Sequence, residues 1–257
     1  MRTLLLFDLD GTLLKTNKTI SERTNRVLKK CKSMGYLIGI STSRGEQNCL
    51  TFLKEIKPDI LISSGGALIK YGDEYIYKNL FSKDRTKELI RTVRTVCGND
   101  VEITVDTIDK HYWNYKIDPK KIDANWGDSI WTDYSDYSEE SLKICAEIFE
   151  AENAIKLERR LTDCDMIRFS DGFWYKFTRK GVTKENAINM ICEKCGIEVS
   201  NIIAFGDDYA DIEMLKVAGI GIAMGNAIRE VKEAADIIID TNDNDGIAVY
   251  LEGYLQQ

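Results

Sequence analysis

The sequence is poor in histidine and proline and has no long apolar run. Among its 257 residues there is one histidine, His111, and there are two prolines, Pro58 and Pro119. A single histidine excludes sites built from several imidazole ligands and argues against a Ser-His-Asp triad, so we expect His111 to be packed or at the surface rather than catalytic. Few prolines and no low-complexity tract leave little room for disorder. No stretch approaches the roughly 20 apolar residues that a membrane span requires, and the short N-terminal apolar run ends in aspartate, unlike a signal peptide.

Basic residues are outnumbered by acidic ones, and the cysteines are scattered. The 35 Lys and Arg residues against 42 Asp and Glu residues give a net charge of −7, which argues against a nucleic-acid partner. Seven cysteines without regular spacing predict reduced thiols and a cytoplasmic location. Cys192 and Cys195 form a Cys-x-x-Cys pair, but they follow the helical pattern of Ile188 and Ile191, and there is no second pair. We therefore interpret them as core residues. No pattern indicates an oligomeric state.

Residues 3–12, Thr-Leu-Leu-Leu-Phe-Asp-Leu-Asp-Gly-Thr, combine an apolar run with two acids. The run predicts a strand buried on both faces, as in a parallel sheet. Asp8 and Asp10 come at its carboxyl end, where open α/β sheets bind ligands, and side chains two residues apart can face one crevice. Gly11 allows a sharp turn directly after them. Alone, an Asp-x-Asp is more often a strand that ends in an acidic turn, so its partners elsewhere in the chain decide the interpretation.

Strands and helices alternate along the first 63 residues. One helix begins at the N-cap Ser21 and ends at Gly35, and another spans Leu50 and Ile56. Strands are expected at residues 3–7, 36–41 and 59–63. This βαβαβ order predicts a right-handed, doubly wound parallel sheet.

From residue 64 the pattern changes to hairpins. We expect one helix capped by Asp84 and ended by Gly98, and another that starts at Ser138 and runs through Phe149. Residues 117–137 have the composition of a loop. Hairpins are expected at residues 67–77, 101–115 and 166–177, the last turning at Ser170-Asp171-Gly172. Antiparallel hairpins with two helices predict a separate α+β domain inserted between α/β units.

Alternation resumes at Thr183, where a helix begins that ends at Gly196. Further strands are expected at residues 201–205, 220–223 and 236–239, with helices between them. We therefore predict an α/β protein whose Rossmann-like, doubly wound parallel sheet is formed by residues 1–80 and 180–257, with an α+β cap domain inserted at residues 81–179. Because Gly65-Gly66 and Lys180-Gly181 flank the insert, we expect the cap to move as a lid on these glycines.

Polar side chains gather at strand ends and helix starts of the predicted core. They are Asp8, Asp10, Thr42, Lys184, Asp207 and Asp211. Carboxylates without an available imidazole suit a hard, oxygen-ligated cation such as Mg²⁺. Thr42, Lys184 and backbone N–H groups would face an anion beside that cation.

Four stretches resemble the four motifs of the haloacid dehalogenase (HAD) superfamily. They are Asp8-Leu-Asp-Gly-Thr, Thr42-Ser-Arg, Lys180-Gly-Val-Thr-Lys184 and Gly206-Asp-Asp-x-x-Asp211. Their order matches that of the family, and so does the insert between the second and third motifs. Residues 221–227 and 235–246 are similar to the Cof-like sugar-phosphatase subgroup.

The resemblance implies a Mg²⁺-dependent phosphatase whose partner is a small phosphate ester, a sugar phosphate in the first place. Asp8 would be the nucleophile that forms an aspartyl-phosphate, and Asp10 would act as general acid and then as general base. Mg²⁺ would bind to Asp8, to the Asp10 backbone carbonyl and to Asp207, with Asp211 supporting them. The residues implied to bind the phosphoryl group are Leu9, Thr42, Ser43 and Lys184.

Four positions depart from the subgroup's pattern. Ser43 stands in place of a glycine, Glu185 in place of a glycine after the lysine, Gly65 in place of an asparagine, and Ala210 in place of an asparagine that contacts phosphate. None of these changes removes a charge that the mechanism needs. Two alternatives remain open, a phosphomutase that returns the phosphoryl group to a sugar and a catalytically weak regulator that binds a phosphorylated ligand.

All four tryptophans lie in the insert. We expect most of them to form its small core. Because sugars stack on aromatic rings, Trp113, Trp126 and Trp131 are the candidates for contact with the leaving group. The sequence does not identify that group.

Overall fold

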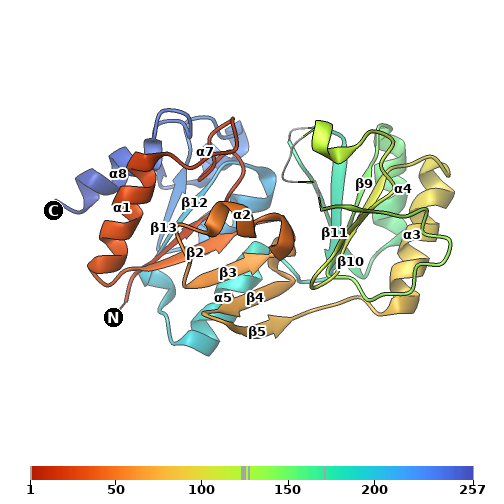
Figure 1. The fold of residues 1–257 in the computed structure, drawn as a ribbon, viewed down its shortest axis with the longest axis horizontal. Helices are drawn as coiled ribbons and strands as arrows, with labels where there is room; N and C mark the ends of the chain where they lie inside the picture. Colours follow the sequence, from red (N-terminus) through yellow and green to blue (C-terminus); the bar gives the residue numbers. More distant parts are fainter. Residues whose placement is uncertain (1, 123–125, 127, 171, 257) are drawn as a thin grey trace.

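The computed structural model describes residues 2–122, 126, 128–170 and 172–256 and contains two β-sheets (Figure 1). An eight-stranded sheet has the order β14-β13-β12-β1-β2-β3-β4-β5, and a six-stranded sheet has the order β10-β11-β9-β6-β7-β8. Figure 1 shows the first sheet and both ends of the chain on one side of the molecule and the second sheet on the other.

Six parallel strands form most of the first sheet, and an antiparallel hairpin extends one edge. The parallel strands are β1 (Leu4–Phe7), β2 (Leu37–Ser41), β3 (Ile60–Ser63), β12 (Ile202–Gly206), β13 (Ile220–Ala223) and β14 (Ile237–Ile238). The hairpin consists of β4 (Leu68–Tyr71) and β5 (Glu74–Lys78). The central strands β1 and β12 are buried along their whole length, which explains their continuous apolar runs.

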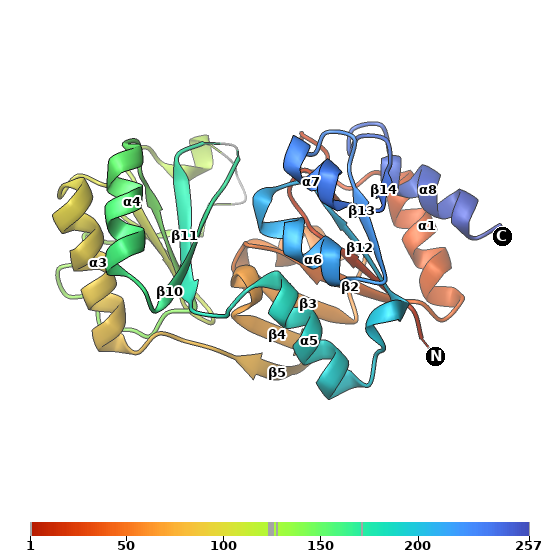
Figure 2. The ribbon, with the colours of Figure 1, turned by 180° about the vertical axis from the view of Figure 1, so that it is seen from behind.

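Helices cover both faces of this sheet, so the predicted doubly wound α/β core is confirmed. Figure 2 shows α5 (Lys184–Cys195) and α6 (Ile212–Val217) in front of the sheet, and α7 (Arg229–Ala234) packs against α6. Figure 1, the opposite view, shows α1 (Glu22–Ser33) and α2 (Leu50–Leu53) in front, and α8 (Gly246–Tyr254) packs against α1. Ser21 caps α1 as predicted, and Thr183 caps α5. Cys192 and Cys195 are partly buried against the core.

Two α-helices cover one face of the second sheet. Its strands are β6 (Ile103–Asp106), β7 (His111–Trp113), β8 (Ile130–Trp131), β9 (Lys143–Glu147), β10 (Cys164–Arg168) and β11 (Trp174–Arg179). The helices α3 (Lys83–Cys97) and α4 (Ala151–Arg160) pack side by side on that face (Figures 1 and 2). The apolar cluster beneath them contains Leu89, Ile144 and Leu157. Side chains of the opposite face line a cavity between the two sheets.

Residues 138–149 contain the strand β9 rather than the predicted helix. The strand β9 lies inside the second sheet, between β6 and β11, and the helix α4 begins only at Ala151. Cys145, an apolar residue, stands between Lys143 and Glu147 on the face that lines the cavity, and the spacing of Leu142, Cys145 and Ile148 then imitates a helical period. Other helix boundaries also differ. Ser82, not Asp84, caps α3, and the C-terminal helix α8 was not predicted.

The chain leaves the first sheet after β5 rather than at Gly65-Gly66, which corrects the predicted position of the hinge. The hairpin β4–β5 belongs to the first sheet because β4 pairs with β3. The connection from Lys78 to Lys83 contains no glycine. Gly66 instead allows close packing, since a Cβ atom there would lie 2.4 Å from the Thr183 carbonyl oxygen.

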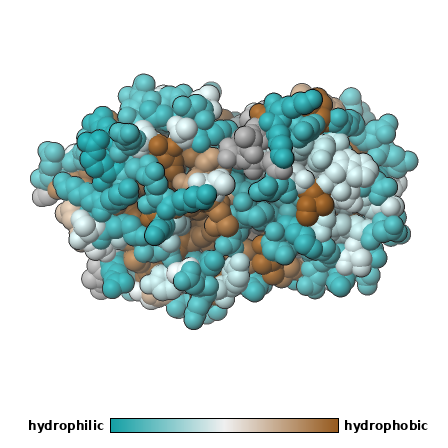
Figure 3. Space-filling model, viewed as in Figure 1, coloured by the Kyte–Doolittle hydropathy of each residue, from teal (hydrophilic) through white to brown (hydrophobic). Residues whose placement is uncertain are grey.

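Hydrophilic side chains cover most of the face shown in Figure 3, and hydrophobic ones form small separate groups. Among the described residues, no helix has the length and apolar character needed to cross a membrane. All seven cysteines lie in the described part of the chain and are free thiols.

Candidate active site

Asp8 and Asp10 follow β1 at the carboxyl edge of the first sheet. The Asp8 N–H donates to the Phe205 carbonyl at 3.0 Å, which extends the pairing of β1 with β12 by one residue. Gly11 has a φ of +77°, and a Cβ atom there would lie 2.1 Å from Asp207 Oδ2. Only glycine therefore allows the loop after β1 to approach the loop after β12 this closely. The approach brings Asp207 beside Asp8.

Lys184 lies between Asp8 and Asp211. Its Nζ atom is 2.5 Å from Asp8 Oδ1 and 2.7 Å from Asp211 Oδ1, and the residue is 3% exposed. Burial disfavours the ammonium ion, but the charges of Asp211 and Asp8 outweigh it and raise the pKa of Lys184 above its ordinary value. Asp211 Oδ2 also accepts the backbone N–H groups of Asp207 and Asp208 at 3.1 and 3.2 Å. Asp211 therefore positions both Lys184 and the loop that carries Asp207.

The carboxylates around Lys184 carry more negative charge than it neutralises. Burial, only partly offset by Lys184, raises the pKa of Asp8 to about 7. Burial and the nearby Asp8 and Asp211 raise the pKa of Asp207 to about 9. Oxygen atoms of Asp8, Asp207 and Asp211 lie within 4.8 Å of one another, and no described residue forms an ion pair with Asp207. Oxygen ligands that converge with surplus negative charge fit a divalent cation such as Mg²⁺.

Asp10 is an ionised carboxylate held by two cations. Arg44 binds it through Nε at 2.6 Å from Oδ2 and through Nη2 at 2.9 Å from Oδ1, and Lys18 Nζ is 2.7 Å from Oδ1. Burial opposes ionisation, but the hydrogen bonds and charge of Arg44, together with Lys18, lower the pKa of Asp10 to about 2.

The residues implied to bind phosphate border the same space. Thr42, Ser43 and Lys184 line the cavity. Thr42 Oγ1 accepts the Arg44 N–H at 3.1 Å, which fixes the loop after β2. The Leu9 side chain is buried in the core, whereas its N–H donates to no described residue.

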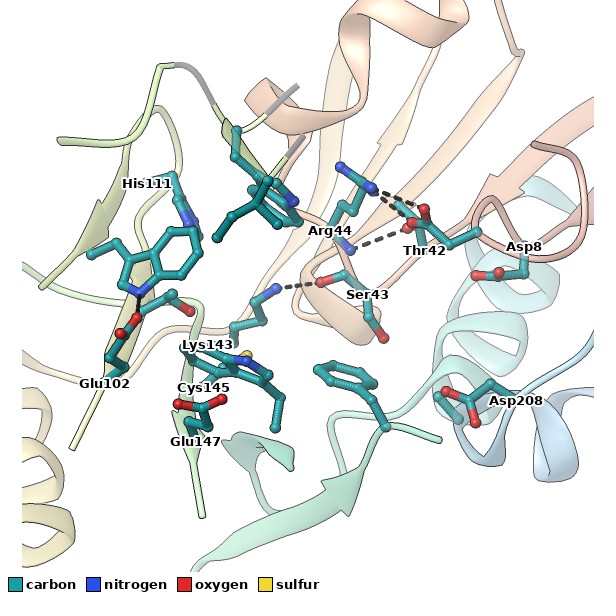
Figure 4. A pocket seen from close by; sticks show the side chains of 18 of the residues that line it. Asp8, Thr42, Ser43, Arg44, Glu102, His111, Lys143, Cys145, Glu147 and Asp208 are labelled. Carbon is teal, nitrogen blue, oxygen red and sulfur yellow. Dashed lines mark hydrogen bonds and ion pairs between the residues drawn. The ribbon is translucent and has the colours of Figure 1, made fainter. Parts of the chain in front are cut away.

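A cavity of about 660 Å³ lies between the two sheets. Figure 4 shows Asp8 on one side of it, Glu102 and Glu147 on the opposite side, and Ser43 and Arg44 between them. The cavity is large enough for a phosphate ester whose leaving group extends away from Asp8.

Three of the four tryptophans line this cavity instead of forming the apolar core of the second sheet. They are Trp113, Trp126 and Trp174. Trp113 Nε1 donates to Glu102 Oε2 at 2.9 Å, and the guanidinium of Arg44 lies 4.5 Å from the centre of the Trp126 ring. Trp131 is 56% exposed and is not among the described lining residues, so it does not belong with the other candidates for substrate contact.

Asp106 connects the second sheet to the loop after β2. Its carboxylate is fully buried, with Lys143 Nζ 3.0 Å from Oδ2 and His111 Nδ1 2.5 Å from Oδ1. Lys143 also donates to the Ser43 carbonyl. Against the effect of burial, Lys143 and His111 lower the pKa of Asp106 to about 2. His111 is packed, as expected, at 3% exposure.

The four departures from the family pattern have separate surroundings. Ala210 lines the cavity and offers it no polar side-chain atom. Gly65 has a φ of +69°, and a Cβ atom there would lie 2.4 Å from Lys176 Nζ, so this buried lysine occupies the space that a side chain would need. Ser43 Oγ has no hydrogen-bond partner among the described residues. Glu185 lies in the first turn of α5, where an acid is favourable.

Several residues that line the cavity had no assigned role in the sequence analysis, among them Arg44, Glu102, Lys143 and Glu147. Arg44 stands inside the Thr42-Ser-Arg motif, but its pairing with Asp10 spans 34 residues and leaves no local signal. Lys143 and Glu147 lie on one face of β9, and Glu102 directly precedes β6, an arrangement that indicates a shared face only once the strand pairing is known.

Comparisons with known proteins support a hydrolase site. A family model described as haloacid dehalogenase-like hydrolase matches residues 5–251. A 5-amino-6-(5-phospho-D-ribitylamino)uracil phosphatase of Bacillus subtilis is 28% identical, with 98% of this chain and 97% of the relative covered. A phosphoglycolate phosphatase of Methanopyrus kandleri is 24% identical, with coverage of 100% and 99%. A solved structure described as a HAD subclass IIB sugar phosphatase superposes with a TM-score of 0.85 at 26% identity and 98% coverage of both chains.

Proposed function

Because the chain belongs to the haloacid dehalogenase-like hydrolase family and is a phosphoric monoester hydrolase, we propose that it is a Mg²⁺-dependent phosphatase of small esters, sugar phosphates in the first place, that works through an aspartyl-phosphate. The observation that carries this proposal is the cluster at the ends of β1 and β12, where Lys184 separates Asp8 from Asp211 and Asp207 lies beside them. The sugar-phosphatase neighbour supports the substrate class.

Asp8 is the proposed nucleophile. One of its carboxylate oxygens attacks phosphorus, the bond from phosphorus to the leaving alcohol breaks, and Asp10 gives the alcohol oxygen a proton. Water then attacks the phosphorus of the aspartyl-phosphate, Asp10 takes a proton from that water, and phosphate and free Asp8 result. The groups proposed to hold the phosphoryl oxygens are Lys184, Thr42, Ser43 and the Leu9 N–H.

Arg44 connects substrate binding to the proton on Asp10. The donor role requires a protonated Asp10, whereas Arg44 and Lys18 keep its pKa at about 2. A phosphoryl group that binds beside Arg44 competes for the guanidinium hydrogen bonds, and the loss of these bonds raises the pKa of Asp10. Binding of the substrate thus favours the protonated form that the first step needs.

The residues that would hold Mg²⁺ are Asp8, the backbone carbonyl of Asp10, and Asp207, with Asp211 supporting them. When bound, Mg²⁺ neutralises the negative charge of a nucleophile and an ester that would otherwise repel each other. The raised pKa values of Asp8 and Asp207 support this assignment, because a divalent cation would offset the neighbouring negative charges that help to raise them.

Residues 1–80 and 180–257 are the proposed catalytic core, and residues 81–179 are the proposed cap, which covers the leaving group as a lid. Two hydrogen bonds between the proposed cap and the proposed core support this arrangement. Lys143 donates to the Ser43 carbonyl, and the Ser170 N–H donates to Asp208 Oδ2 at 3.2 Å. All phosphate esters share the phosphoryl group, so discrimination between them falls to the cap.

Two alternatives are distinguishable in one assay. A phosphomutase would return the phosphoryl group to a sugar and would depend on a bisphosphate activator, whereas a hydrolase releases phosphate without one. A weak regulator would bind phosphorylated ligands with negligible turnover. Ala210, which offers phosphate no amide, is the feature that favours the regulator.

Metal dependence tests the proposed function. On a panel of phosphomonoesters, EDTA should eliminate phosphate release and Mg²⁺ should restore it. Ca²⁺ should substitute poorly because it prefers more ligands and longer bonds. Asp207→Ala should raise the Mg²⁺ concentration needed or remove activity. Full activity of exhaustively chelated enzyme would contradict the proposal.

The tryptophans of the cavity test the role of the cap. Because Trp113 and Trp126 line the cavity, at least one of Trp113→Phe and Trp126→Phe should change the ratio of kcat/KM values between two sugar phosphates by about threefold to tenfold. Trp131→Phe is the matched control, since this exposed ring should leave the ratio unchanged. Equal losses on all substrates would mean that the rings only stabilise the cap.

A further inference from the structure

The loop after β2 is held to the first sheet at two of its backbone carbonyls. The Thr42 carbonyl accepts the Gly65 N–H at 3.0 Å, and the Arg44 carbonyl accepts the Ser64 N–H at 2.7 Å. Both donors lie in the loop after β3, the neighbouring strand. The Ser43 carbonyl between them accepts no backbone N–H of the described residues. The loops of the first sheet therefore leave the middle carbonyl without a donor.

Lys143 of β9 supplies this donor from the second sheet, as Figure 4 shows. Its ammonium group donates to the Ser43 carbonyl, and the residue is 4% exposed. Asp106, the residue paired with Lys143 across β6 and β9, contacts the same ammonium at 3.0 Å and fixes its direction. A Cβ atom at Gly45 would lie 2.9 Å from Asp106 Oδ2, and Ser64 Oγ lies 3.4 Å from that oxygen. The two sheets are thus in close contact at this point.

The hydrogen bond from Lys143 reaches Thr42 through one peptide unit. The Ser43 carbonyl and the Arg44 N–H belong to the same planar group and point in opposite directions. A donor that holds the carbonyl therefore also fixes the N–H, which donates to Thr42 Oγ1 at 3.1 Å. Because the Thr42 hydroxyl accepts this bond, its own hydrogen is directed elsewhere, and Thr42 lines the cavity. The direction in which Thr42 can donate thus depends on a side chain of the second sheet.

We propose, on the basis of the phosphatase function above, that Lys143 is a positioning residue that orients Thr42 toward the phosphoryl group. Lys143 then acts on the part of the substrate that all phosphate esters share. The proposed cap completes the phosphate site in addition to enclosing the leaving group. When the cap moves away, the loop after β2 loses the bond that fixes Thr42.

Lys176 provides a matched control for the charge of Lys143. It is also a buried lysine of the second sheet, at 1% exposure, and a Cβ atom at Gly65 would lie 2.4 Å from its Nζ. Burial and the charges of Lys184 and Lys143 lower its pKa to about 8, so most of it is still ionised at pH 7. Its Nζ has no hydrogen-bond partner among the described residues. Both lysines therefore bring positive charge to these loops, but Lys143 is the one that holds a carbonyl.

Lys143→Met removes the donor and keeps most of the length of the side chain. With Mg²⁺ at pH 7, kcat/KM for p-nitrophenyl phosphate and for glucose 6-phosphate should fall by about tenfold or more, and by the same factor for both. The inhibition constant of inorganic phosphate should rise. Lys176→Met should leave kcat/KM within about threefold of the native value. A loss confined to glucose 6-phosphate, or equal losses in the two variants, would overturn the proposal.

A double-mutant cycle with Thr42→Val tests the route from Lys143 to the phosphoryl group. The valine side chain keeps the shape of threonine and lacks the hydroxyl. If Lys143 acts through this hydroxyl, Lys143→Met should lower kcat/KM by less than about threefold in the Thr42→Val background. A purely structural role of Lys143 would make the two losses independent. Additive losses would therefore overturn the proposal.

A paired variant separates positioning from folding. Lys143→Met alone leaves the charge of Asp106 buried, whereas Lys143→Met combined with Asp106→Asn removes both charges. The paired variant should have native circular dichroism and the same kinetic loss as Lys143→Met. Native activity of the folded paired variant would overturn this inference and leave the phosphatase function standing. Release of no phosphate from either ester by the native protein would overturn that function, and this inference with it.

Discussion

Asp8→Asn is expected to abolish phosphate release while the fold is retained. The amide is nearly isosteric with the carboxylate, but it cannot attack phosphorus to form an aspartyl-phosphate. Lys184 also pairs with Asp211, at 2.7 Å, so we expect the buried ammonium to keep one partner in the variant. We expect kcat/KM to fall by at least about four orders of magnitude on every ester of the panel.

The measurement is single-substrate kinetics with Mg²⁺, together with circular dichroism to verify the fold. Asp73→Asn, in the exposed turn between β4 and β5, is the matched control and should retain full activity. Activity of Asp8→Asn close to that of the native enzyme would refute the covalent mechanism. Loss of activity with loss of the native spectrum would instead show that Asp8 supports the structure.

Asp106→Asn is expected to lower the free energy of unfolding by about 3–5 kcal/mol, the cost of leaving a buried charge unpaired. Asp106 is fully buried, and its carboxylate neutralises Lys143, which is 4% exposed, through a contact of 3.0 Å. The asparagine removes this negative charge and leaves the ammonium of Lys143 enclosed. Urea unfolding at pH 7 should show the loss as a lower midpoint.

The pH dependence of the difference provides a second check. The pKa of Asp106 is lowered to about 2 in the folded protein, so its ion pair contributes stability above the unfolded pKa of about 4 and loses that contribution as the pH falls toward 2. The difference between native and variant stability should therefore shrink below pH 4. Asp100→Asn, at an exposed position, should show no such difference. A loss below about 1 kcal/mol at pH 7 would mean that Lys143 finds another partner.

The sequence by itself determined the elements whose signals are local. Apolar runs with capping residues identified β1, β2, β12 and the helices that begin after Ser21 and Thr183. They also placed Asp8 directly after the first strand, because a buried strand and the turn that ends it are encoded within about ten residues.

The tertiary structure decided what depends on pairing between distant segments. The strand β9 looked helical because the apolar Cys145 interrupts the alternation of polar Lys143 and Glu147 and forms a three-residue spacing with Leu142 and Ile148. The hinge was misplaced because only the pairing of β4 with β3 assigns the hairpin to the first sheet.

The difference between local signals and contacts across the chain also explains which site residues the sequence predicted and which it did not. Asp8 and Lys184 stand in contiguous motifs, and they became candidates because they follow a predicted strand and open a predicted helix and because these motifs resemble those of the family. The ion pair of Arg44 with Asp10 joins residues that are 34 positions apart in sequence. The backbone hydrogen bond from Glu147 to Glu102 joins residues that are 45 positions apart. Such contacts arise from strand order and register, which are set by packing across the whole sheet rather than by any one segment.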